Sequence, residues 1–160
     1  DLVDTRVPLL VEVKSEWTPP DQAFLHQIAE AARAYRGPIA LMSFDPAVMT
    51  ALRALAPTIP RGIVSGSYAT GDAEWWSDAL SAERRAALRD LLESGPAQPS
   101  FFAYEVDALP TPVTRFLREV ISMPLFTWTV RTEAQRTIAS TWADAAIFEG
   151  DAPKPAGTSS

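Results

Sequence analysis

Short apolar runs rich in β-branched and aromatic residues alternate along this chain of 160 residues with segments of helical periodicity. This repeated strand–helix order is typical of parallel β/α units, whose helices cover the faces of a sheet. It fits either an open parallel sheet or part of a barrel. The pattern predicts strands at 7–13, 39–44, 61–65, 101–106, 125–130 and 145–148, and helices at 21–35, 46–55, 82–93, 112–121 and 132–142.

The composition indicates a soluble, globular chain. With 47% hydrophobic and 21% charged residues and a mean hydropathy of −0.02, it can bury a core that a disordered chain lacks. The net charge of −6 disfavours a nucleic-acid surface, and no run reaches the roughly 20 apolar residues of a membrane-spanning helix. We expect one domain over 1–150 and a disordered tail over 151–160.

The chain contains no cysteine. This excludes disulfides, zinc–thiolate sites and thiol catalysis within it, but it fits the cytosol and the periplasm alike. The first residues lack the basic and apolar regions of a signal peptide, although a precursor could have lost one. The compartment stays open, with a slight preference for the cytoplasm.

The first predicted strand ends on two charges, Glu12 and Lys14. Residues two apart on a strand point to the same face, so we expect the carboxylate and the ammonium side by side. Burying them beside Val and Leu is costly without a ligand, metal or partner, which indicates a site. Ligands of parallel β/α folds bind at the carboxyl ends of the strands, near which the sequence places Glu12, Lys14, Ser43, Phe44, Trp128 and Glu149.

A family resemblance rests on five segments: Val-Pro-Leu-Leu-Val-Glu-Val-Lys-Ser at 7–15, Ala-Leu-Met-Ser-Phe-Asp-Pro at 40–46, Pro-Arg-Gly-Ile-Val-Ser at 60–65, Leu-Phe-Thr-Trp-Thr-Val-Arg at 125–131 and Ala-Asp-Ala-Ala-Ile-Phe-Glu at 143–149. In their order and spacing they resemble the C-terminal part of bacterial glycerophosphodiester phosphodiesterases. The family fold is a TIM-type (β/α)8 barrel of the phospholipase C-like kind, and a whole barrel takes about 250 residues. The resemblance therefore implies part of such a barrel.

The reaction that the resemblance implies is metal-dependent hydrolysis of a glycerophosphodiester to sn-glycerol 3-phosphate and an alcohol. In the family, a His-Arg-Gly motif and a His-Asp motif in the N-terminal part supply the general acid and base. Neither motif occurs in these 160 residues, and the one histidine, His26, is expected on a solvated helix face. We therefore expect this chain alone to hydrolyse little or nothing. Its start, a few residues before a core strand, favours upstream residues in the natural protein.

Two charged residues take roles from the resemblance. Glu12 matches the glutamate that helps bind the divalent cation, usually Mg²⁺ or Ca²⁺, for which a carboxylate oxygen is a suitable ligand. A salt bridge to Lys14 or Arg36 is the alternative for Glu12. Lys14 matches the lysine near the substrate phosphate, where a cation stabilises developing charge on the phosphoryl oxygens. A solvated lysine is the alternative there.

Three further residues are assigned to substrate binding. Trp128 matches an aromatic residue that lines the site, with plain barrel packing as the alternative. Ser43 and Phe44 match a motif at the rim of the pocket, and Ser43 is not a nucleophile because no base accompanies it. Two positions depart from the family pattern, which leaves the substrate contacts there open: Arg131 stands where Asn is common, and Glu149 where Thr-Asp often follows the last strand.

Two weaker patterns in the sequence favour structural interpretations. Trp75 and Trp76, near Tyr68, can form a lipid- or partner-facing patch, but packing against the barrel is the simpler interpretation. Three arginines of one helix can attract phosphate, yet they alternate with acids and indicate a solvated face: Arg84, Arg85 and Arg89.

The competing hypothesis is a non-catalytic binding or assembly module. An incomplete parallel barrel leaves backbone groups unpaired at its two edge strands. Those edges would pair with a second copy of the chain, giving a homo-oligomer, or with a separate N-terminal half. Under the enzyme hypothesis the partner is a small-molecule glycerophosphodiester.

Overall fold

In the computed structural model, which describes residues 6–69 and 79–150, six parallel strands form one sheet. The order is β1-β2-β3-β4-β5-β6, so each strand pairs with the next strand along the chain. The strands are β1 (Leu9–Glu12), β2 (Ile39–Ser43), β3 (Arg61–Ser65), β4 (Phe101–Glu105), β5 (Leu125–Val130) and β6 (Ala145–Phe148). The helices are α1 (Gln22–Ala34), α2 (Pro46–Leu55), α3 (Ala82–Arg89), α4 (Pro112–Glu119) and α5 (Glu133–Trp142), with short 3-10 turns at Gly95–Ala97 and Val106–Ala108.

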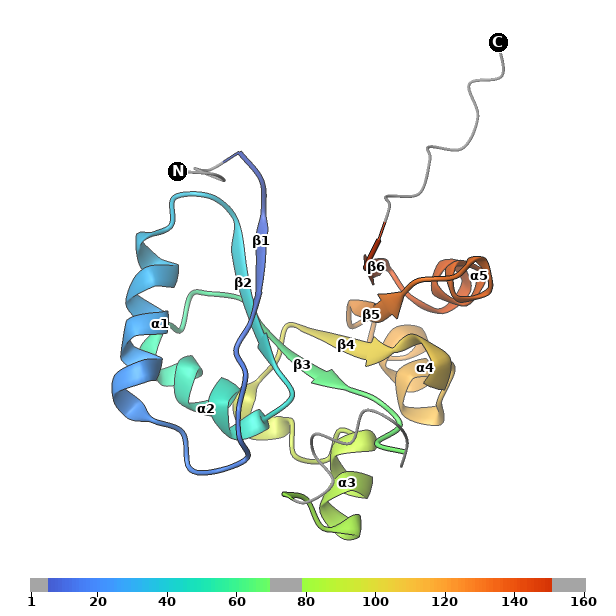
Figure 1. Cartoon of the computed structure of the whole chain (residues 1–160), viewed down its shortest axis with the longest axis horizontal. Coiled ribbons are helices and arrows are strands. Elements are labelled where there is room, and N and C mark those ends of the chain that lie inside the picture. Colours follow the sequence, from blue (N-terminus) through green and yellow to red (C-terminus); the bar gives the residue numbers. More distant parts are fainter. Residues whose placement is uncertain (1–5, 70–78, 151–160) are drawn as a thin grey trace.

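The predicted β/α class is confirmed. Strictly sequential parallel strands with a helix after almost every one are the arrangement of a β/α barrel, here open between β1 and β6 among the described strands. Figure 1 shows α1 and α2 beside the early strands and α4 and α5 beside the late ones, with the sheet twisting from β1 to β6. The structure is therefore an open part of a barrel.

The helices begin where the sequence supplies caps. The side chains of Asp21, Asp45 and Ser81 accept hydrogen bonds from the first-turn amides of α1, α2 and α3. Thr111 and Thr132 each form a capping box at the start of α4 and α5. These side chains bind amides that have no partner within the helix, which explains why local sequence placed the helix starts well.

One helix ends earlier than predicted. The sequence indicated a helix to residue 93, but α3 ends at Arg89. Leu91 adopts a left-handed φ of 61°, the amide of Leu92 donates to the carbonyl of Ala87 at 2.9 Å, and that of Leu91 donates to Leu88 at 3.0 Å. This is the Schellman closure that glycine usually makes. Because a leucine takes the position, no local residue pattern predicts this helix end.

The two faces of the sheet bury different side chains. One face packs against α1, α2 and α4 and includes Val13, Leu41 and Leu125. The opposite face, which corresponds to the interior of a barrel, gathers Met42, Phe44, Val64, Tyr68, Leu80, Leu88, Phe101 and Ala103 with the partly buried Trp17, Phe126, Trp128 and Ile147. We call this opposite face the inner face.

Some predictions fall on residues outside the described ranges. Trp75, Trp76 and the tail 151–160 are among them, so the aromatic patch, the disorder and the domain boundary at residue 150 stay predictions. Among the described residues, no helix has the length and apolar character to span a membrane.

Candidate active site at the carboxyl ends of the strands

Glu12 and Lys14 lie side by side, as the strand period predicted. Glu12 is the last residue of β1, and Nζ of Lys14 lies 2.6 Å from its Oε1. The exposed fraction is 78% for the Lys14 side chain and 25% for that of Glu12. The salt bridge named as the alternative for Glu12 is therefore formed with Lys14. Because the lysine is so exposed, its ammonium can leave the pair for another anion at little cost.

Glu12 also has the features of a cation ligand. Its Oε1 is buried, and within the described residues no hydrogen bond is aligned on it, the contact with Lys14 being ionic. The described residues contain no group of three or more acidic or histidine side chains that could hold a metal. Mg²⁺ commonly uses only one or two carboxylates and completes its shell with water and substrate phosphate. Glu12 fits one ligand of such a site.

Ser43 is placed at the predicted end of β2 but is fully buried. Its hydroxyl donates to the carbonyl of Val13 at 2.7 Å and accepts the amide of Asp45 at 3.1 Å. These bonds fix the end of β1 to the turn after β2. The substrate contact assigned to Ser43 stays a prediction; the contacts that the structure gives it are with the backbone.

Phe44 and Trp128 come together on the inner face. Their ring centroids lie 5.1 Å apart and the ring planes meet at 79°, an edge-to-face contact. The indole Nε1 of Trp128 donates to the carbonyl of Ala103 at 3.2 Å, which fixes the ring against β4. The two rings form a rigid aromatic wall beside the carboxyl ends of the strands. This arrangement is compatible with packing alone and also with lining a site.

Glu105 was missed by the sequence reasoning. It ends β4 in register with Trp128 and points to the inner face like Ala103 and Phe101, two and four residues before it. Its Oε2 accepts the amide of Ser67 at 2.7 Å and the Ser67 hydroxyl at 2.6 Å. Glu105 has the same sequence pattern as Glu12, because it is a carboxylate at the end of an apolar strand.

The two departures from the family pattern are coupled to each other. Nη2 of Arg131 lies 2.7 Å from Oε2 of Glu149, so the residues after β5 and β6 form an ion pair. Both side chains are more than half exposed, and an exposed pair of this kind contributes about 0–1 kcal/mol. The pair links the chain after β5 to the chain after β6.

Other charged candidates lie away from this group. His26 is exposed on α1, as expected, with Nδ1 2.7 Å from the carbonyl oxygen of Gln22. Arg89 pairs with Asp90 on the surface, whereas Arg84 is half-buried, pairs with Glu93 and lies over the ring of Trp17. The prediction of a solvated arginine face holds for Arg89 and only in part for Arg84.

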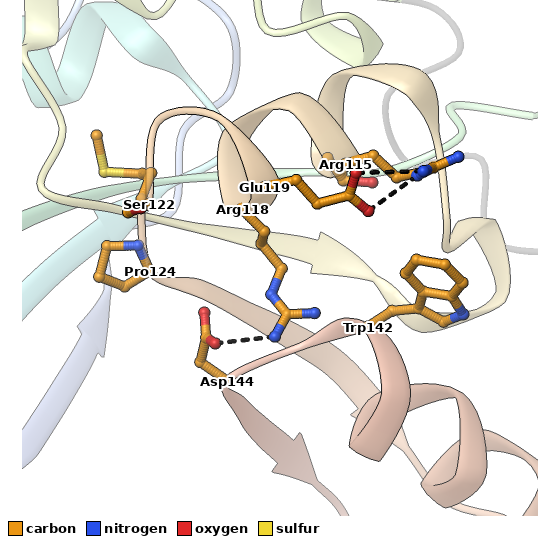
Figure 2. Close-up of a pocket in the computed structure, with 9 residues that line it drawn as sticks. Arg115, Arg118, Glu119, Ser122, Pro124, Trp142 and Asp144 are labelled. Atoms are coloured by element: carbon orange, nitrogen blue, oxygen red, sulfur yellow. Dashed lines mark hydrogen bonds and ion pairs between the residues drawn. The ribbon is translucent and has the colours of Figure 1, made fainter.

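A cleft of about 510 Å³ lies at the opposite end of the strands. Pro124 precedes β5 and Asp144 precedes β6, so the cleft is at their amino ends. Figure 2 shows Arg118 directed at Asp144, 3.1 Å away, and Arg115 paired with Glu119. Hydrogen bonding to the guanidinium lowers the pKa of Glu119. Its charged side chains are thus paired with one another in the structure.

No protein-family model matches the sequence, and a search of curated proteins gave no match. Solved structures do share the fold. A protein of Silicibacter pomeroyi assigned as a glycerophosphoryl diester phosphodiesterase aligns with a TM-score of 0.56 and 21% identity over 87% of this chain and 45% of its own. One of Galdieria sulphuraria assigned as a glycerophosphodiester phosphodiesterase aligns with a TM-score of 0.61 and 12% identity over 89% and 53%.

An Oleispira antarctica phosphodiesterase, solved with the product sn-glycerol-3-phosphate, aligns with a TM-score of 0.50 and 14% identity over 81% of this chain and 48% of its own. The chain thus spans about half the length of these structures. At such identities the comparison establishes the fold. The predicted resemblance to part of these barrels is confirmed at that level.

Proposed function

We propose that this chain is part of a metal-dependent glycerophosphodiester phosphodiesterase and supplies the phosphate-binding side of its active site. The observation that carries the proposal is the Glu12–Lys14 pair at the carboxyl end of β1, with a buried carboxylate oxygen and a largely exposed ammonium. The likeness to phosphodiesterase barrels supports it. A hydrolysable glycerophosphodiester is then the substrate, and sn-glycerol 3-phosphate and an alcohol are the products.

In this proposal each side chain has a distinct part. Glu12 offers one oxygen to a divalent cation, which when bound neutralises charge on the phosphoryl oxygens. Lys14 leaves Glu12 to face a phosphate oxygen and stabilises the negative charge that develops there. Trp128 and Phe44 line the wall beside the reacting group. A general acid and base must come from outside the set described here, since His26 faces solvent on α1.

The proposal is tested by isothermal titration of the 160-residue chain with sn-glycerol 3-phosphate in the presence of Mg²⁺. Lys14→Met is expected to weaken binding about tenfold, because a hydrogen bond to a charged group contributes about 1.5–3 kcal/mol. Glu12→Gln should abolish the Mg²⁺ dependence. Arg36→Met, which removes an exposed cation elsewhere, should change nothing. Equal affinities for all four proteins would contradict the proposal.

A hydrolysis assay adds a second test. With glycerophosphocholine as the probe, the 160-residue chain is expected to release little or no sn-glycerol 3-phosphate, because losing an acid or base role typically costs a factor of about 10²–10⁴. Ordinary turnover by this polypeptide would show that the family's two histidines are not required.

An assembly role is the second candidate, and the sheet edges favour it. Among the described strands, β1 and β6 each pair on one side only, and their residues Leu10 and Phe148 are 37% and 48% exposed. Sedimentation velocity decides: a dimer that dissociates on Leu10→Lys supports pairing through the β1 edge. A monomer at all concentrations contradicts it.

A further inference from the structure

Asp45 is a buried carboxylate whose two oxygens accept hydrogen bonds from different segments of the chain. It is 2% exposed and lies between β2 and α2. Its Oδ1 accepts the amide of Ala47 at 2.9 Å, which caps α2. A serine or threonine would satisfy that cap equally well, so capping alone does not require burying a charge here.

The second oxygen of Asp45 binds the segment that carries Lys14. Oδ2 accepts the hydroxyl of Ser15 at 2.6 Å, across 30 residues of sequence. On the other side of Lys14, the amide of Val13 donates to Met42 at 2.7 Å and its carbonyl accepts the Ser43 hydroxyl at 2.7 Å. Val13 is thus fixed to the end of β2 and Ser15 to the start of α2, while Lys14 itself remains exposed.

The same carboxylate faces a cation from a third segment. Nη2 of Arg84, on α3, lies 3.9 Å from Oδ1 of Asp45 and 3.3 Å from Oε2 of Glu93. The Arg84 guanidinium also lies 5.4 Å from the ring centroid of Trp17, in the loop after β1. Asp45 therefore lies where the loop after β1, the start of α2 and the helix α3 meet.

We infer that Asp45, acting through Ser15, is a positioning residue that holds Lys14 at the carboxyl end of β1, facing the phosphate of the substrate. The inference rests on the proposed function for its substrate and on the contacts above for its geometry. A lysine whose backbone is fixed on both sides loses less freedom when its ammonium binds an anion, which raises affinity.

The first measurement needs no ligand. The chain has two lysines, Lys14 and Lys154, so ¹⁵N-lysine labelling gives two ammonium signals, and Lys154→Arg assigns them. Relaxation of the Lys14 signal should show more motion in Ser15→Ala and in Asp45→Asn, which retains an Oδ1 for the cap. Ser15→Thr should restore the wild-type value. Ser140→Ala is the matched control, because it removes one hydroxyl hydrogen bond on α5.

The second measurement is the dissociation constant for sn-glycerol 3-phosphate with Mg²⁺. Ser15→Ala is expected to raise it about threefold to tenfold, and Ser15→Thr to return it to within about twofold of wild type. Unchanged Lys14 motion and affinity in a folded Ser15→Ala protein would overturn the inference. If wild type binds no sn-glycerol 3-phosphate but Ser15→Ala still mobilises Lys14, the positioning stands and the proposed function fails.

Discussion

Phe44, which follows β2, touches Trp128 of β5 edge to face, with 5.1 Å between the ring centroids. These strands are three places apart in the sheet, or about 14 Å in a flat one. Side chains that stand perpendicular to a flat sheet would not meet over that distance. The contact shows that the sheet curves and that its inner face is concave, as in a barrel.

The Phe44–Trp128 contact should be measurable by a double-mutant cycle. Trp128→Ala is expected to lower the free energy of unfolding by about 3 kcal/mol, because it removes a large ring and leaves the carbonyl of Ala103 without its indole donor. With Phe44→Ala, the coupling between the two rings should be about 0.5–1.5 kcal/mol. Urea unfolding of the four proteins gives this value, and strict additivity would place the rings apart.

Gly62 should not tolerate alanine while Phe101 is present. A Cβ at Gly62 would lie 2.1 Å from the ring of Phe101, which is buried and stacked on Phe126 at 5.0 Å. Gly62→Ala is therefore expected to cost about 1–3 kcal/mol, measured by thermal or urea unfolding. In the Phe101→Leu background the added cost should be smaller. An equal cost in both backgrounds would argue against the ring contact.

Alkaline pH should destabilise the fold through Tyr104. Burial, and next the charge of Asp90, raise the pKa of Tyr104 to about 12, and its hydroxyl donates to the carbonyl of Arg89 at 2.9 Å. The unfolded chain loses this proton near pH 10, so the contribution is intact below pH 10 and is lost as the pH rises to about 12. Urea midpoints between pH 8 and 11 should fall less steeply for Tyr104→Phe than for wild type. If the urea midpoints of the two proteins fell in parallel with pH, Tyr104 would not be the cause of the alkaline destabilisation.

Glu105 should fix the loop after β3. Glu105→Ala removes the acceptor of both the amide and the hydroxyl of Ser67, so hydrogen exchange at the Ser67 amide should accelerate about tenfold or more. Glu133→Ala, at an exposed position of α5, is the control and should leave this rate unchanged. Protection that survives Glu105→Ala would mean that other contacts order the loop.

The strands and helices were largely predictable because their causes are local. Apolar spacing and N-cap residues such as Asp45 and Thr132 lie within a few positions of the elements they determine. The end of α3 was not predictable, since Leu91 takes a left-handed conformation that glycine usually adopts. The neighbouring Gly95-Pro96 was the stronger local signal, and it lies four residues farther on.

The candidate site was predictable only where the interacting residues lie on the same strand or directly after it. Glu12 and Lys14 share a strand face, so their pairing followed from the period of two. Glu105 binds Ser67 across 38 residues, and Asp45 binds Ser15 across 30. Such pairs depend on which loops the sheet brings together, and no local pattern encodes them.

A ¹⁵N NMR titration of the chain with sn-glycerol 3-phosphate and Mg²⁺ tests directly whether the carboxyl ends of the strands bind the phosphate. We expect saturable shifts gathered at the carboxyl ends of the strands, largest at the amides of Glu12, Lys14, Phe44 and Trp128. Shifts gathered instead around Arg118, Trp142 and Asp144 at the amino ends, or no saturable shift at millimolar concentrations, would contradict this expectation.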